Sequence, residues 1–344
     1  MHVYSETSGI RDVPPSPGPG PRPPGDPRLG WGRPPVPVLR QRRDGILPTV
    51  AAALSLPGRD HPLTGTASRS GPPPALHPAV RDVLDGLPTE QRERHGGRCP
   101  EAVLLSRHLT ASGAQRSGQV RRALKNARIT TRYIREDGDP RHGEYAPHCR
   151  SCTALLGHFG VRSVSPAGED TPRVPGRRTT RRSAGRAPGD AGTVVEEALL
   201  AAGWQPGRRE GAPAEQWADT LRAHLSPAGH AHRIFPVAFE IWAEYGGLRL
   251  VPPGPGHEFA PSPVSLDPLL GLHWARTLGD LGRALDTELS PLGAEDGGRA
   301  LLAVDRDGRV YCLDHSGDWY LGPDIRTALA TLLAGTPPAR LSPP

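Results

Sequence analysis

The stretch HGGRCPEAVLLSRHL (residues 95–109) decides how the N-terminal half of the chain folds. Proline is favoured at the first position of a helix, where its missing N–H costs nothing, so Pro100 predicts a helix start. Val103 and Leu104 then follow at helical spacing. Cys99 is therefore expected at the helix entrance, and Glu101 in the first turn.

A second stretch, APHCRSCTALLGHFG (residues 146–160), predicts another helix of this kind. Pro147 precedes the helix, and Gly160 is expected to end it. Cys149 and Cys152 lie about one turn apart at its start, so both sulfurs can face one ion. Because helix N-termini favour negative charge, thiolates at both helix entrances are stabilised electrostatically.

These two helix entrances together offer a candidate metal site. Cys99, Cys149 and Cys152 as ligands would leave one position open on a tetrahedral zinc ion, which is typical of a catalytic site. Zinc at such a site lowers the pKa of a water molecule toward neutrality. Glu101, two residues from the first cysteine, has the identity and the place needed to move the proton.

Three other interpretations remain open on the residues alone. Cys149 and Cys152 could be a redox pair, although no thioredoxin-like strand precedes them. A structural zinc ion could take His95 or His148 as its fourth ligand. Cys99 could be an ordinary buried cysteine that is unrelated to the pair.

The cysteine pattern resembles that of a known enzyme class. A ligand-x-Glu followed later by Pro-Cys-x-x-Cys is typical of zinc nucleobase deaminases, in which three cysteine ligands are one variant. HGGRCPE and PHCRSC also resemble the YwqJ-related deaminases of bacterial polymorphic toxins, over about residues 75–165. The resemblance implies a cytidine-deaminase-like three-layer α/β fold, Zn²⁺ as cofactor, the three cysteines as its ligands and Glu101 as the catalytic residue. One departure is His148, which stands between Pro147 and the first cysteine of the pair.

Composition divides the chain into folded and unfolded parts. Residues 1–70 and 166–191 are rich in Pro and Gly and have little to bury, so we predict a disordered Pro/Gly-rich N-terminal arm and a flexible linker. Within the arm, residues 46–56 are a candidate short helix. The α/β domain occupies residues 71–165, with strands expected at 129–136 and 161–165.

Residues 192–337 predict an α+β domain with helices packed on an antiparallel sheet. The histidines here are scattered without metal-ligand spacing, and Cys312 is expected to be a small buried residue. The segment 300–322 predicts a hairpin with an Asp-Gly turn. Residues 338–344 are expected to be a disordered tail. Helical patterns cover 193–204, 214–225, 324–335 and the first part of 231–250.

A series of short motifs in this domain resembles the SUKH superfamily of immunity proteins, which are related to SMI/KNR proteins. The resemblance implies an α+β module that neutralises a toxin by direct contact, and therefore a protein toxin or effector as its partner. The motifs are, in order, AGWQPGR (202–208), EYGGL (244–248), LSPLG (289–293), DGRVY (307–311) and WYLG (319–322).

Charge differs between the two domains. Residues 71–165 contain fifteen basic and nine acidic residues, whereas residues 191–344 contain twelve basic and nineteen acidic residues. A basic domain fits a nucleic acid or nucleotide as substrate. No stretch is long and apolar enough to span a membrane and no signal peptide is predicted, so we expect a cytoplasmic location and no membrane partner.

The sequence therefore predicts a zinc-dependent hydrolytic deaminase of nucleobases or nucleotides, linked to an immunity-type protein-binding module, in a bacterial toxin–immunity context. The acidic module either covers the basic site in cis or binds a related toxin in trans. The alternative is a catalytically inactive immunity or decoy protein that acts only by binding a partner protein.

Overall fold

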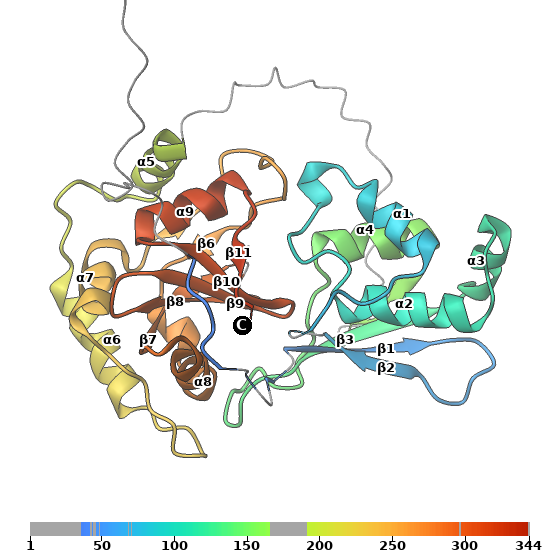
Figure 1. The fold of residues 1–344 in the computed structure, drawn as a ribbon, viewed down its shortest axis with the longest axis horizontal. Helices are drawn as coiled ribbons and strands as arrows, with labels where there is room; N and C mark the ends of the chain where they lie inside the picture. The colour runs from blue at the N-terminus through green and yellow to red at the C-terminus, as the bar shows by residue number, and fades with distance from the viewer. Residues whose placement is uncertain are drawn as a thin grey trace, which may run out of the picture. The chain divides into compact units, whose positions relative to one another are not determined.

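The structure is a computed structural model that describes residues 36–165 and 191–342, apart from residues 42, 44–45, 48, 68, 70 and 296. The predicted linker, except its last residue, and the first 35 residues of the predicted arm lie outside the described residues. Figure 1 labels the helices and strands of the two folded domains.

The N-terminal domain is built on a four-stranded sheet of order β2-β1-β3-β4. Strand β1 runs antiparallel to β2 and β3, whereas β3 and β4 are parallel. Helix α2 packs on β1 and β2, and α1 and α4 pack against α2 and against each other, which confirms the α/β class. The elements are β1 (Val50–Ser55), β2 (Leu63–Thr66), α1 (Pro78–Asp85), α2 (Pro100–Ala111), α3 (Ser117–Ala123), β3 (Arg128–Tyr133), α4 (Arg150–Phe159) and β4 (Arg162–Ser163).

Two of these strands lie where the sequence predicts disorder. Strand β1 is an inner strand, and the side chains of Ala52 and Leu54 on it are buried in the core of the domain. The prediction of a disordered arm up to residue 70 is therefore wrong for β1 and β2, and so is the predicted short helix at residues 46–56. Hydrogen-bonded neighbours on both sides hold VAAALS as a strand, because tertiary pairing overrides the helical preference of alanine.

The C-terminal domain contains a seven-stranded antiparallel sheet in which each strand lies beside the next one in the sequence. This confirms the α+β class. Strand β11 and the buried Leu341 fall within the predicted tail, so that part of the prediction is wrong. The strands are β5 (Arg249–Leu250), β6 (Val264–Ser265), β7 (Leu289–Glu295), β8 (Ala300–Asp305), β9 (Val310–Asp314), β10 (Gly317–Gly322) and β11 (Ala339–Arg340).

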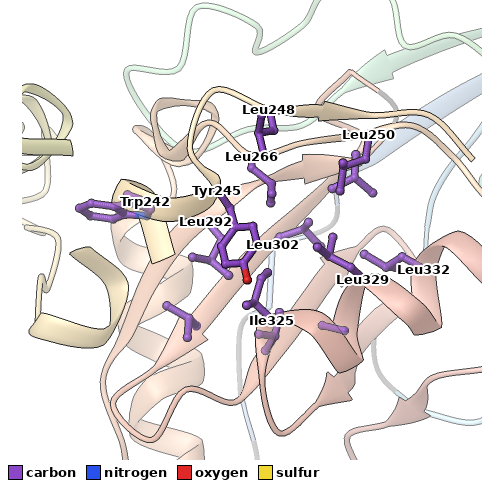
Figure 2. Close-up of a cluster of buried hydrophobic side chains, with 14 of the residues drawn as sticks. Trp242, Tyr245, Leu248, Leu250, Leu266, Leu292, Leu302, Ile325, Leu329 and Leu332 are labelled. Carbon is purple, nitrogen blue, oxygen red and sulfur yellow. The ribbon is translucent and has the colours of Figure 1, made fainter. Parts of the chain in front are cut away.

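Both faces of this sheet are buried. Successive side chains of a strand point to opposite faces, so Leu302 belongs to a core with α5, α6, α7 and α9, while Leu301 belongs to a second core with α8. Figure 2 shows part of the first core, in which Tyr245 of α7 lies among apolar side chains of the sheet and of α9, and Trp242 lies at one side. The helices are α5 (Ala191–Ala201), α6 (Gly211–Ala223), α7 (Pro236–Tyr245), α8 (Ala275–Leu285) and α9 (Ile325–Ala334).

None of the helices among the described residues has the length and apolar character needed to cross a membrane.

The buried strand β1 gives a first prediction. We expect Leu54→Ala to lower the free energy of unfolding by about 2–5 kcal/mol, because Leu54 is fully buried and its loss leaves a cavity. Val164→Ala is the control, since Val164 is 43% exposed, and we expect a change within about 0.5 kcal/mol. Urea unfolding followed by circular dichroism measures both; equal stability of the two variants would contradict a structured β1.

Candidate metal centre and active site

Three of the four cysteines form one buried cluster between the ends of two helices. Cys99 is the N-cap of α2, Cys149 is the N-cap of α4, and Cys152 lies in the first turn of α4. Their exposed fractions are 2%, 4% and 1%. The structure therefore brings together the three thiols that the sequence singles out, at the helix entrances where it places them.

The three sulfurs are spaced as metal ligands are. Cys99 Sγ and Cys149 Sγ lie 3.7 Å apart, and the three Sγ atoms are all within 4.8 Å of one another. Two thiolates on a tetrahedral zinc ion, each about 2.3 Å from the metal, lie about 3.8 Å apart. The soft donor set and this spacing fit zinc.

Glu101 lies beside the thiols and is held by a histidine. Its Oε1 is 2.8 Å from His148 Nδ1, and His148 Nε2 is 2.8 Å from the Ser163 hydroxyl. Both ring nitrogens of His148 are therefore engaged away from the sulfurs, which excludes His148 as the fourth ligand in this arrangement. The residue that interrupts the Pro-Cys-x-x-Cys pattern instead orients the carboxylate.

The thiols differ in their readiness to lose a proton. Hydrogen bonds from Cys152 and Cys99 hold the pKa of Cys149 well below its usual range, and His95 adds to this effect. The same hydrogen bonds, together with burial, raise the pKa of Cys99 and of Cys152. The cluster thus favours a thiolate at Cys149 with two thiols that donate to it, and all four cysteines of the chain are free.

Two buried histidines, His95 and His315, lie close to Cys99 of the cluster. His315 Nε2 lies 3.1 Å from Cys99 Sγ, and the ring of His95 contacts the ring of His315 edge-on at 4.1 Å. Both nitrogens of His95 and the Nδ1 of His315 are buried without a hydrogen-bond partner. Burial and the nearby His95 lower the pKa of His315 to about 3, so its imidazole is neutral.

A small cleft leads to the cluster, and both domains line it. Cys99, Glu101 and Cys149 line it from the N-terminal domain, while Arg299 and His315 line it from the C-terminal domain. His95 lines a separate cleft with Arg94 and Asp314. Two of the three predicted thiols and the predicted carboxylate therefore line one cleft together with two residues that the sequence does not predict, Arg299 and His315.

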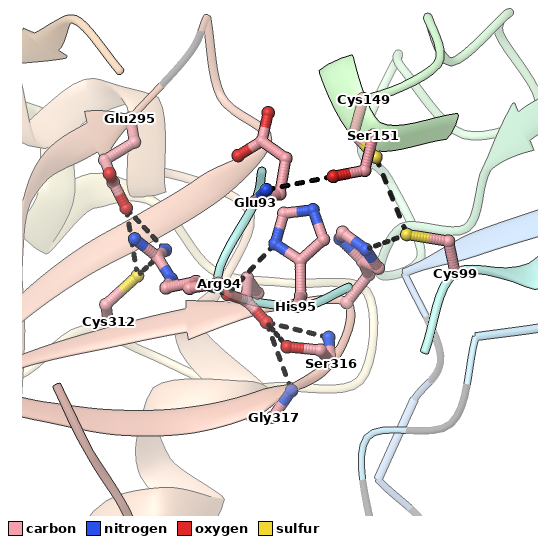
Figure 3. A network of polar contacts seen from close by, with 12 residues as sticks. Glu93, Arg94, His95, Cys99, Cys149, Ser151, Glu295, Cys312, Ser316 and Gly317 are labelled. Carbon is pink, nitrogen blue, oxygen red and sulfur yellow. Dashed lines mark hydrogen bonds and ion pairs between the residues drawn. The ribbon is translucent and has the colours of Figure 1, made fainter. Parts of the chain in front are cut away.

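A buried group of charges lies next to this site, as Figure 3 shows. The Arg94 guanidinium is 2.5 Å from Glu295 and 3.1 Å from Asp314, and it also contacts Cys312 Sγ at 3.0 Å. Burial raises the pKa of Asp314, but the positive charges around the carboxylate, that of Arg94 above all, outweigh burial and hold this pKa well below its usual range. Cys312 is buried as expected, in contact with Arg94 and Glu295.

His315 is the functional candidate that sequence reasoning misses. The segment 300–322 is predicted to be a single hairpin whose second strand is 309–314, but the chain turns back a second time at His315-Ser316 and continues into β10, which pairs with β9. The signal for this turn is the Asp-His-Ser-Gly string between two runs of strand-forming residues.

The comparisons with known protein families agree with this arrangement. Residues 35–161 match the family model of the YwqJ-like deaminase, and residues 192–335 match that of the SUKH-3 immunity protein. The chain joins a deaminase-like domain to an immunity-protein domain. Searches of curated proteins and of solved structures gave no match. The predicted fusion is confirmed, and the deaminase match begins before β1, in agreement with the strand order of the sheet.

The charge group at Arg94 generates a second prediction. We expect Arg94→Met to lower the free energy of unfolding by about 3–5 kcal/mol, because Glu295 and Asp314 would remain buried without their counter-charge. Arg222→Met is the control: Arg222 pairs with Asp219 at the surface, and its loss should cost less than about 1 kcal/mol. Urea unfolding followed by tryptophan fluorescence measures both; similar values for the two variants would contradict the role of Arg94.

Proposed function

We propose that the N-terminal domain is a zinc-dependent hydrolytic deaminase that acts on the amino group of a cytosine- or adenine-type base, free or in a nucleic acid. The observation that carries this proposal is a cluster of three thiols, two of which line one cleft together with Glu101, within the region that matches a deaminase family. The excess of basic residues in 71–165 supports a nucleotide or nucleic acid as the substrate class.

In this proposal Cys99, Cys149 and Cys152 hold the metal. A bound zinc ion supplies the Lewis acid that makes water a nucleophile near neutral pH. The positive ends of α2 and α4 stabilise the thiolates that the ion requires.

Glu101 moves the protons of the reaction. One of its carboxylate oxygens accepts a proton from the attacking water and later delivers a proton to the departing amino group, which leaves as ammonia while the ring carbon becomes a carbonyl. The contact of His148 with Oε1 fixes the carboxylate in one orientation. His148 is thus a positioning residue, and Ser163 holds its other ring nitrogen.

The C-terminal domain is proposed to bind a protein toxin. Its match to the SUKH-3 immunity family and its excess of acidic residues support a basic protein as the partner. The pairing of a toxin-type deaminase and an immunity-type module in one chain supports a bacterial toxin–immunity context and a cytoplasmic place of action.

The metal site is tested by zinc content. We expect about one zinc ion per chain in the wild-type protein and a loss of zinc in Cys99→Ser and in Cys152→Ser, because a hydroxyl replaces a thiolate ligand. Cys312→Ser is the matched control, since Cys312 is equally buried but is not part of the cluster, and it should retain zinc. Elemental analysis of the purified proteins gives the result; zinc that is indifferent to Cys99 would overturn the proposed site.

The catalytic proposal is tested by ammonia release from cytosine and adenine bases, nucleosides, and single-stranded RNA and DNA. The assay uses the wild-type protein and His315→Ala, because His315 lines the same cleft as Glu101. We expect Glu101→Gln, introduced into whichever protein is active, to lower the rate by about 100- to 10,000-fold while zinc is retained. The exposed Glu144→Gln should keep the rate. No ammonia from either zinc-loaded protein would leave a protein that acts by binding alone.

A further inference from the structure

The tip of the β9–β10 hairpin is built as a rigid support for one imidazole. Asp314 Oδ1 accepts hydrogen bonds from Ser316 N (2.7 Å), Ser316 Oγ (2.6 Å) and Gly317 N (3.1 Å). Asp314, His315 and Ser316 are all nearly inaccessible to solvent, although they form the turn of a hairpin. Turns of this kind ordinarily lie at the surface, so the burial of this one shows that it is docked.

The hairpin docks on the thiol cluster. His315 Nε2 is 3.1 Å from Cys99 Sγ, and the Nε2 atom, Cys99 Sγ and a nitrogen of His95 lie within 4.8 Å of one another. A sulfur and a nitrogen that bind one tetrahedral zinc ion lie about 3.6 Å apart. The separation of Cys99 and His315 is within about half an ångström of that value. The imidazole nitrogen and the three sulfurs do not all lie within 4.8 Å of one another, so the imidazole becomes a ligand when the hairpin tip moves toward the other two thiols.

Position in the cleft distinguishes the two histidines. A deaminase needs its open metal position on the side of the catalytic carboxylate, where the substrate enters. His315 lines the same cleft as Glu101, whereas His95 lines the other cleft. His315 therefore stands where water and substrate would have to be.

Polar contacts between the two domains hold the hairpin in this place. Arg94 of the deaminase domain bonds to Glu295 and Asp314 of the immunity domain. Glu136 accepts hydrogen bonds from the backbone N–H groups of Arg276 and Thr277 at the start of α8, at 3.2 and 2.8 Å. The charges of the two domains are also opposite in sign, which favours their association.

We infer that the immunity domain binds the deaminase domain of its own chain and that His315 is the fourth ligand of the zinc ion. This inference rests on the zinc deaminase proposed above. Three thiolates and one imidazole complete a tetrahedral site, and a closed site has no position for water. The chain therefore holds its own active site shut, and displacement of the hairpin opens it.

Cobalt(II) reports the coordination of the site without any need for turnover. The protein is loaded with Co²⁺ in place of zinc, and imidazole is added as a probe for an open position. We expect the visible spectrum of the wild-type protein to stay unchanged by imidazole. His315→Ala should show a saturable change, because imidazole enters the vacated position. His315→Asn, which preserves more of the packing, should respond in the same way, and His95→Ala should behave as the wild type.

Two outcomes would overturn the assignment of His315. One is a wild-type site that takes up imidazole as readily as His315→Ala. The other is a response that appears in His95→Ala and is absent in both His315 variants, which would make His95 the fourth ligand.

Activity then separates this inference from the deaminase proposal. With zinc bound, His315→Ala should release ammonia at least about tenfold faster than the wild type, since removal of an internal competitor raises the competent fraction. A spectral contrast between wild type and His315→Ala without ammonia release from either would leave His315 as a ligand and overturn the deaminase proposal. Equal activity of the two proteins would overturn self-inhibition.

Discussion

The meeting of two helix starts is the constraint on which the rest of this molecule depends. Helices α2 and α4 begin at the same point, so the N-cap thiols of Cys99 and Cys149 lie 3.7 Å apart. The sheet, α1 and the core of the N-terminal domain hold the starts of α2 and α4 together. Glu101 lies in the first turn of α2 and lines one cleft together with both of these thiols.

The site on the deaminase side was predictable because its signals are local. Proline after Cys99, the three-residue spacing of Cys149 and Cys152, and the glycine that ends α4 all specify helix ends within a few residues. Each sulfur could therefore be placed at the start of a helix. The one local irregularity, His148, could not be interpreted from the sequence, because its partners Glu101 and Ser163 come from distant parts of the chain.

Two other features depend on long-range contacts, and the sequence alone did not reveal them. Strand β1 is rich in alanine, and its conformation comes from the pairing with β2 and β3 rather than from its own preference. His315 looked like one of several scattered histidines because the turn that carries it lies within a longer run of strand-forming residues. His315 lies close to Cys99 only because the two domains pack against each other. Neither the segment around Cys99 nor the segment around His315 contains a signal that predicts this contact.

The cap of α8 has a consequence for the choice of partner. The N-cap residue of α8, Trp274, makes no side-chain hydrogen bond to the helix start. Instead, the carboxylate of Glu136 from the deaminase-like domain accepts hydrogen bonds from the N–H groups of the second and third helical residues. Part of the secondary structure of the immunity-type domain is thus completed by a residue of the deaminase-like domain. If the immunity-type domain binds deaminases through this surface, as inferred above, a deaminase without a carboxylate at this place would leave N–H groups at the start of α8 unsatisfied. Under that inference, one helix end would favour a deaminase with an acidic residue at the position of Glu136 over an otherwise similar deaminase without it.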